Sequence, residues 1–188
     1  MRTQTLYDRL PERIVTYPDP VLRERCRPVE QFGQALESLV GRMLELMKAG
    51  RGVGLAAPQV GLPLRLFVAN PTGRPDDDRV YVNPRIVEAR EPVEAEEGCL
   101  SLPEVHILVK RGRCCVIQAC DLRGEAFEET GCDLPARIWQ HEIDHLDGRL
   151  LIDRMTPADR LEHKAVLAGL EAAYARRRKP PARRPARR

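Results

Sequence analysis

The chain has 188 residues, of which 43% are hydrophobic and 31% are charged. This length suits one domain rather than two full-sized ones, and the composition is that of a globular protein rather than a disordered or fibrous one. No stretch approaches the roughly 18 consecutive apolar residues of a membrane-spanning helix, and no apolar signal-peptide block follows the N-terminus. We therefore expect a cytoplasmic protein that has no membrane or DNA partner.

The positive charge is concentrated at the C-terminus. Residues 176–188 carry 8 of the 31 basic side chains and no acid, which leaves 23 basic against 28 acidic side chains in residues 1–175. Prolines and like charges predict that this segment is disordered. The sequence thus indicates a folded domain over 1–175 and a disordered basic tail over 176–188, which could dock on the ribosome or could serve only as a solubilising segment.

Apolar residues from Phe32 to Met47 recur at spacings of three and four, which predicts an amphipathic helix that ends at Gly50. The middle of the chain has shorter apolar runs separated by Gly, Pro and Asp, as strands do. A hairpin turn is expected at 121–124, between the last two strands. The expected strands are 64–69, 80–83, 105–109, 114–121 and 125–129.

Two more helices are predicted after the strands. One covers about 134–147, with Asp133 as its N-cap and Gly148 at its end. Thr156 and Asp159 form a capping box that starts another, reaching to about residue 177. Strands flanked by helices, without βαβ alternation, predict an α+β fold. We expect a compact single domain with short antiparallel strands around a central helix, an N-terminal helix and a C-terminal helix.

Six cysteines with no C-x-x-C pair and no export signal indicate reduced thiols rather than a disulfide framework or a zinc ribbon. Cys114, Cys115 and Cys120 fall in a strand-like run, where we expect them to pack as small apolar residues.

The strongest chemical signal is the sequence H-E-I-D-H over residues 141–145. Histidines four residues apart lie on one face of a helix, so His141 and His145 can bind one metal ion, and Glu142 can approach a water molecule on that ion. The sequence therefore predicts a catalytic metal site on the helix at 134–147.

A catalytic metal needs a third protein ligand. Leu151 occupies the position of the third His in one protease pattern, which excludes that solution. A Glu on a following helix, Glu162 or Glu171, remains open. Cys99, in the segment E-G-C-L-S-L-P, could instead supply a thiolate, or could be a small buried apolar residue.

Residues 52–61 read G-V-G-L-A-A-P-Q-V-G. This segment lacks the pattern of a phosphate-binding loop. Its small residues permit close approach of another backbone or of a ligand, and Gln59 offers an amide donor, although a tight structural turn explains the composition equally well.

Taken in order, G-V-G-L-A-A-P-Q-V-G, E-G-C-L-S-L-P and Q-H-E-I-D-H-L-D-G closely resemble the signatures of the peptide deformylase family. With Y-P-D-P-V-L-R at 17–23, the resemblance covers about residues 14–155. It implies a compact α+β fold and metal-dependent hydrolysis of the N-formyl group from formyl-methionine of nascent polypeptides, with release of formate.

The resemblance also implies roles for single residues. Cys99, His141 and His145 bind the metal, with Fe²⁺ as the native ion and Zn²⁺ or Ni²⁺ as possible occupants after purification. Glu142 takes a proton from water and returns it to the leaving amine, while Gln59 and the Leu100 N–H donate to the formyl oxygen. The residues that hold the peptide or line the methionine pocket are Val53, Gly54, Glu97, Gly98, Leu134 and Ile138.

Two alternatives remain at this stage. One is a zinc endopeptidase that uses His141, His145 and either Glu162 or Glu171. The other is a noncatalytic ribosome- or RNA-binding module, for which the basic tail is the motive because such tails bind phosphate by counterion release.

Overall fold

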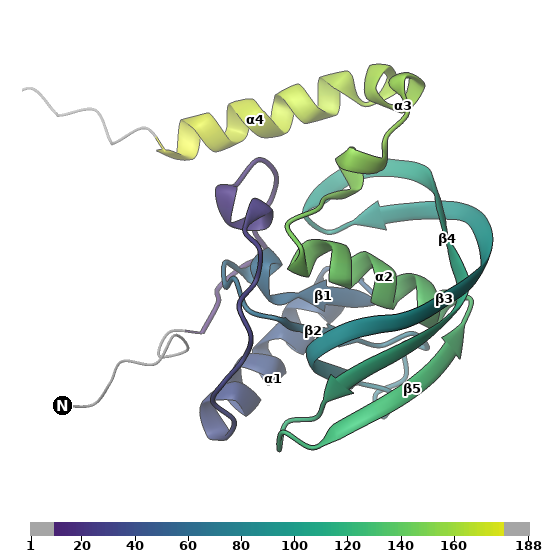
Figure 1. The fold of residues 1–188 in the computed structure, drawn as a ribbon. Coiled ribbons are helices and arrows are strands. Elements are labelled where there is room, and N and C mark those ends of the chain that lie inside the picture. The colour runs from purple at the N-terminus through teal and green to yellow at the C-terminus, as the bar shows by residue number, and fades with distance from the viewer. Residues whose placement is uncertain (1–9, 179–188) are drawn as a thin grey trace, which may run out of the picture.

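The computed structural model describes residues 10–178, which contain one five-stranded antiparallel sheet and four α-helices (Figure 1). Strand order follows chain order, from β1 to β5. The strands are β1 Gly54–Ala56, β2 Leu66–Ala69, β3 Arg79–Cys99, β4 Leu102–Cys120 and β5 Ala126–Cys132. The helices are α1 Gln34–Ala49, α2 Leu134–Leu146, α3 Pro157–Glu162 and α4 Lys164–Arg178. The predicted α+β class is confirmed.

β3 and β4 are longer than the sequence predicts. The expected strands at 105–109 and 114–121 are parts of the single strand β4, and the acidic residues from Glu91 to Glu97 lie within β3. Buried and more exposed positions largely alternate along the β4 strand, so polar residues do not interrupt it. Register shifts bend the hairpin, and Figure 1 shows β3 and β4 curving around α2.

The two main helices cover opposite faces of β2. Leu66 and Val68 pack in the cluster that contains the buried face of α1, whereas Phe67 belongs to the cluster that contains α2. All three are fully buried. Within the second cluster Trp139 of α2 lies edge-on to Tyr81, with ring centroids 5.9 Å apart. The central position of α2 places His145 in the interior and His141 at a partly buried position.

The helix predictions are confirmed with three corrections. Asp133 does not cap α2: its φ is 57° and its side chain accepts no capping hydrogen bond. The last predicted helix is interrupted at His163, although the capping box of Thr156 and Asp159 is present. Because α4 extends to Arg178, the first residues of the expected tail are helical, and 179–188 lie outside the described residues.

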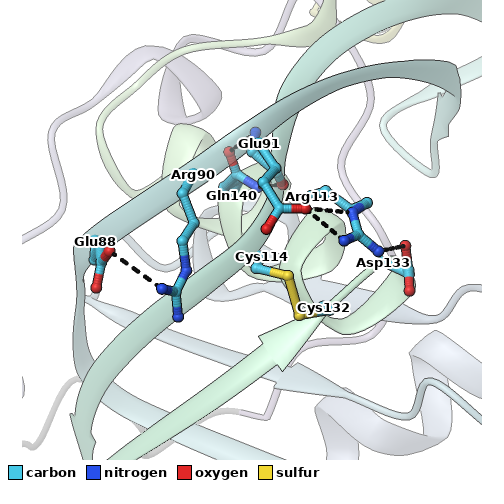
Figure 2. Close-up of a disulfide and its surroundings, with 9 residues drawn as sticks. Glu88, Arg90, Glu91, Arg113, Cys114, Cys132, Asp133 and Gln140 are labelled. Atoms are coloured by element: carbon cyan, nitrogen blue, oxygen red, sulfur yellow. Dashed lines mark hydrogen bonds and ion pairs between the residues drawn. A yellow bond between two sulfur atoms is a disulfide. The ribbon is translucent and has the colours of Figure 1, made fainter.

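The expectation that all cysteines are reduced is wrong. Cys114 and Cys132 form a disulfide between β4 and β5, while Cys26, Cys99, Cys115 and Cys120 are free thiols (Figure 2). The two partners lie directly opposite each other in the β4–β5 register. That pairing depends on strand register, which the spacing of cysteines in the sequence does not contain.

Between residues 10 and 178, none of the helices combines the length and the apolar character that crossing a membrane requires.

Candidate active site

The end of β3 and the second half of α2 bring three potential metal ligands together. Donor atoms of Cys99, His141 and His145 all lie within 4.8 Å of one another, and the Cys99 Sγ is 3.2 Å from the His145 Nε2. This is the one such group of His, Cys, Asp or Glu found among residues 10–178. Glu162 and Glu171 are not part of it, and Glu171 instead accepts a hydrogen bond from the Tyr17 hydroxyl at 2.7 Å.

Glu97 fixes the orientation of His141. The His141 Nδ1 lies 2.9 Å from a Glu97 carboxylate oxygen, and a proton on Nδ1 would leave Nε2 free as a ligand atom. Burial opposes ionisation of Glu97, but hydrogen bonds from His141 and Arg111 outweigh it and hold its pKa well below the usual value. Glu97 lines the cleft, and its hydrogen bond with His141 ties it to a metal-ligand candidate.

Arg111 connects this carboxylate to the rest of α2. Its guanidinium donates to Glu97 at 2.6 and 2.9 Å and to Asp144 at 2.8 Å, and only 5% of the residue is exposed. Arg154 donates to the same Asp144 oxygen, and Arg137 donates to Glu97 at 2.7 Å. Breaking a buried pair of this kind costs about 3–5 kcal/mol, because one charge is left uncompensated. The network therefore holds α2 and the end of β3 in one arrangement.

Sequence analysis missed Arg111, although a signal was present. Val105, Ile107 and Val109 are buried at alternate positions of β4, and Arg111 continues that alternation. A charged residue on the buried face of a strand requires a partner, and Glu97 and Asp144 are the partners.

The two histidines have opposite electrostatic surroundings. Burial lowers the pKa of His141, but hydrogen bonds with Cys99 and Glu97 outweigh this effect and hold the pKa well above its usual value. Burial, followed by the proximity of His141, holds the pKa of His145 well below its usual value. A neutral imidazole with an available lone pair is the form that binds metal ions.

Glu142 lies beside the ligand candidates and is only 4% exposed. Burial raises its pKa to about 7, and its Oε2 has no hydrogen-bond partner among the described residues. Gly54 is required for this placement, since a Cβ atom there would lie 2.4 Å from the Glu142 Oε1. A buried carboxylate with one unpartnered oxygen and a pKa near neutrality is suited to exchange protons with a bound water or substrate.

Gln59 is buried next to Cys99. Its Oε1 accepts a hydrogen bond from the Ala56 N–H at 2.8 Å, which fixes the direction of the amide. The Nε2 donates to the Cys99 Sγ at 3.5 Å and to the Ser101 Oγ at 3.2 Å. The predicted donor is therefore held next to the candidate ligand Cys99.

A cleft of about 460 Å³ opens onto this group. The residues that line the cleft differ in exposure. Val53 and Leu134 are 42% and 43% exposed, whereas Ile138 is only 4% exposed. His145 lies outside the lining and is 1% exposed, so it is placed beneath the cleft. The other predicted site residues all line the cleft: Val53, Gly54, Gln59, Glu97, Gly98, Cys99, Leu100, Leu134, Ile138, His141 and Glu142.

Comparisons with known proteins point to one family. The family model described as polypeptide deformylase matches residues 11–161, which include every residue of the site. The chain belongs to this family. A peptide deformylase of Thermotoga neapolitana is 46% identical over 150 residues, which are 79% of this chain and 90% of the relative. The chloroplastic/mitochondrial peptide deformylase 1B of Arabidopsis thaliana is 42% identical over 167 residues, covering 87% of this chain and 61% of the relative.

Solved structures of peptide deformylases have the same fold. The Plasmodium falciparum structure aligns with a TM-score of 0.86 at 35% identity, covering 89% of this chain and 100% of that one. The Legionella pneumophila structure aligns with a TM-score of 0.81 at 41% identity, covering 89% and 98%. The peptide deformylase fold therefore extends over most of this chain.

Proposed function

We propose that this peptide deformylase hydrolyses the N-formyl group of formyl-methionine on nascent polypeptides, releasing formate, with Cys99, His141 and His145 as the ligands of its metal. The observation that carries the proposal is the convergence of these three donors within 4.8 Å beside the unpartnered Oε2 of Glu142. One thiolate and two imidazoles suit Fe²⁺, Zn²⁺ or Ni²⁺. We propose Fe²⁺ as the native ion, with Zn²⁺ or Ni²⁺ as possible occupants after purification.

A metal bound here would act as a Lewis acid and lower the pKa of water, to about 7 in the best-known zinc enzyme. Glu142 is the general base: its carboxylate takes the proton of the attacking water and then delivers it to the departing amine. Burial serves this role, because it raises the pKa of Glu142 to about 7. The carboxylate can then both accept and release a proton near neutral pH.

Gln59 and the Leu100 N–H are the proposed donors to the formyl oxygen, which gains negative charge as water attacks. Gln59 is pre-oriented, since its own carbonyl is occupied by the Ala56 N–H. Leu100 directly follows Cys99 and lines the cleft. Loss of one such donor typically lowers the rate by about 10² to 10³.

The substrate backbone is proposed to lie along Val53, Gly54 and Gly98, with its methionine against Leu134 and Ile138. β1 is an edge strand, so one side of its backbone is available to an extended peptide. Glycine at position 54 keeps that approach free of a side chain, and the two apolar residues of α2 provide a hydrophobic wall.

The direct test is formate release from a formyl-Met tripeptide by protein purified without oxygen. Glu142→Ala is expected to lower kcat by about 10²- to 10⁴-fold while the metal content stays unchanged. Glu162→Ala, on the exposed helix α3, is the matched control and should keep wild-type activity. A wild-type protein that contains metal but releases no formate would contradict the proposal.

A finer proposal concerns location. We propose that the enzyme works in the cytoplasm and that the basic residues of 176–188 bring it to the ribosome, where its substrate emerges. Arg177 already donates to the Thr16 hydroxyl at 3.1 Å, so the test deletes only 179–188. Co-sedimentation with ribosomes at low salt should fall and should also weaken with added salt in the full chain. Unchanged co-sedimentation of the shortened chain would refute this role.

A further inference from the structure

The Cys114–Cys132 disulfide lies directly before α2. Only Asp133 separates Cys132 from Leu134, the first residue of the helix. Cys132 is exposed, whereas Cys114 is 6% exposed. Figure 2 shows the sulfur–sulfur bond joining the two strands, with Arg113 paired to Glu91 and to Asp133 beside it. One sulfur of the bond therefore belongs to an exposed residue, Cys132, near the N-terminus of the helix that carries the proposed metal ligands.

Four consecutive residues of β4 hold α2 and the segment before it. The Arg111 side chain donates to Asp144, and the Gly112 backbone exchanges two hydrogen bonds with the Gln140 amide at 3.0 and 2.8 Å. The Arg113 carbonyl accepts from the Asp133 N–H at 2.7 Å. Cys114 makes the fourth link, to Cys132. The disulfide is the only covalent link of the four, and it acts at the N-terminal end of the helix.

The segment between the disulfide and α2 is strained. Asp133 has φ 57° and ψ −121°, a backbone conformation that favours glycine. Such a conformation persists only where surrounding contacts impose it. The contacts that impose it here are the disulfide, the hydrogen bond to Arg113 and the start of the helix. Removing the disulfide would therefore allow Asp133 to relax.

Relaxation at Asp133 would reach the substrate cleft. Leu134, Arg137 and Ile138 of the first turns of α2 line it. Arg137 donates to Glu97 at 2.7 Å, and its N–H donates to the Asp133 carbonyl at 3.0 Å. The rest of the helix keeps the Arg111–Asp144 and Gly112–Gln140 links to β4, so the effect should be confined to the substrate side.

The free thiols are less suited to exchange. Burial raises the pKa of Cys26 to about 12 and raises that of Cys115 as well, which keeps both thiols protonated and unreactive. Cys99 belongs to the candidate metal group. Cys120 lies at the far end of β4, opposite Ala126.

We propose that Cys114–Cys132 is a thiol–disulfide exchange site for dithiol reductants, and that its redox state sets how firmly the first turn of α2 binds the formyl-methionyl peptide. Exposed disulfides are the labile ones, and those of cytosolic proteins are usually transient or redox-sensing. The effect on peptide binding rests on the proposed deformylase function, whereas the exchange reaction does not.

The exchange reaction balances with the dithiol as the two-electron donor. One thiolate of the reductant attacks the Cys132 sulfur, and the Cys114 sulfur leaves and takes up a proton. The second thiol of the reductant then displaces Cys132 from the mixed disulfide. The reductant becomes a cyclic disulfide, and the protein gains two thiols.

Thiol counting and hydrogen exchange test the site without requiring turnover. Protein prepared without reductant, alkylated in denaturant and weighed by mass spectrometry should carry four labels, and dithiothreitol should raise the number to all six cysteines. Reduction should speed amide exchange at Asp133 and Arg137 about tenfold and leave Asp147, beyond the other end of α2, unchanged. Six labels without reductant, or equal exchange in both states, would overturn the proposal.

Kinetics test the coupling to the substrate. Dithiothreitol should raise KM for the formyl-Met tripeptide about threefold to tenfold while kcat stays within about twofold. Cys114→Ser/Cys132→Ser should have the same raised KM with and without dithiothreitol, which separates reduction from metal chelation by the reagent. Cys120→Ser is the control and should respond as wild type does. An unchanged KM in an active wild-type enzyme would overturn the coupling, while inactivity in both states would instead contradict the proposed function.

Discussion

The two halves of α2 are held in different ways. The C-terminal half carries His141, Glu142 and His145, and buried ion pairs through Glu97, Arg111 and Asp144 hold it against β3 and β4. The N-terminal half starts at a strained residue and an exposed Leu134, next to a disulfide. The comparison indicates that buried ion pairs hold the proposed metal ligands, whereas the disulfide and the Arg137–Glu97 pair tie the substrate-facing turn.

The largest effect is expected where the C-terminal half meets β3. Cys99→Ser should lower metal affinity by more than about 100-fold. Mutation of a residue that only orients a metal ligand already lowers metal affinity or activity by about 10- to 100-fold. Competition with a chromogenic chelator measures this affinity. Cys120→Ser should bind metal as wild type does. Wild-type affinity in the Cys99 variant would favour the site with a glutamate ligand and would contradict the account.

A smaller loss is expected when only the orientation of His141 is disturbed. Glu97→Gln removes the carboxylate that the His141 Nδ1 and two arginines contact, and should lower metal affinity or activity by about 10- to 100-fold. Glu94→Gln, at an exposed position on the same strand, should have no effect. Circular dichroism of both variants checks that the fold is retained. Full activity of the Glu97 variant would show that orientation of His141 is set elsewhere.

Two glycine variants compare the cleft with a position outside it. In Gly54→Ala the added methyl would lie 2.4 Å from the Glu142 Oε1 and 2.9 Å from Ile138, so kcat/KM should fall at least about tenfold. Gly41→Ala places a methyl on the exposed side of α1, where nothing lies within 4 Å. That variant should stay active and gain about 0.5–1 kcal/mol in the free energy of unfolding, measured by urea denaturation. Equal activity of both variants would disprove the close approach at Gly54.

The smallest effect is expected at Asp133, the strained residue directly before α2. Asp133→Gly removes a side chain from a residue with φ 57°, which relieves strain of about 1–3 kcal/mol against a glycine entropy cost of about 0.5–1 kcal/mol. The exposed pair with Arg113, at 3.9 Å, is worth little. The free energy of unfolding should therefore rise by about 1 kcal/mol. A loss of stability would mean that Asp133 makes a contribution beyond its backbone.

The sequence was sufficient to predict the helix that carries the site, because spacing and the H-E-x-x-H pattern are local properties. Cys99 became the preferred third ligand only through the family resemblance; its proximity to His145 depends on where β3 ends. The disulfide and the paired length of β3 and β4 depend on strand register, which local patterns do not determine. Asp133 was misassigned because aspartate is a common N-cap, whereas the hydrogen bond to Arg113 and the turn from β5 impose another backbone conformation.

The most direct test of the account is the identity of the metal ligands. X-ray absorption spectroscopy of the protein loaded with one equivalent of Zn²⁺ reports the atoms bound to the ion and their distances. We expect one sulfur at about 2.3 Å and two imidazole nitrogens at about 2.0–2.1 Å, contributed by Cys99, His141 and His145. A shell of nitrogen and oxygen ligands without sulfur would contradict it.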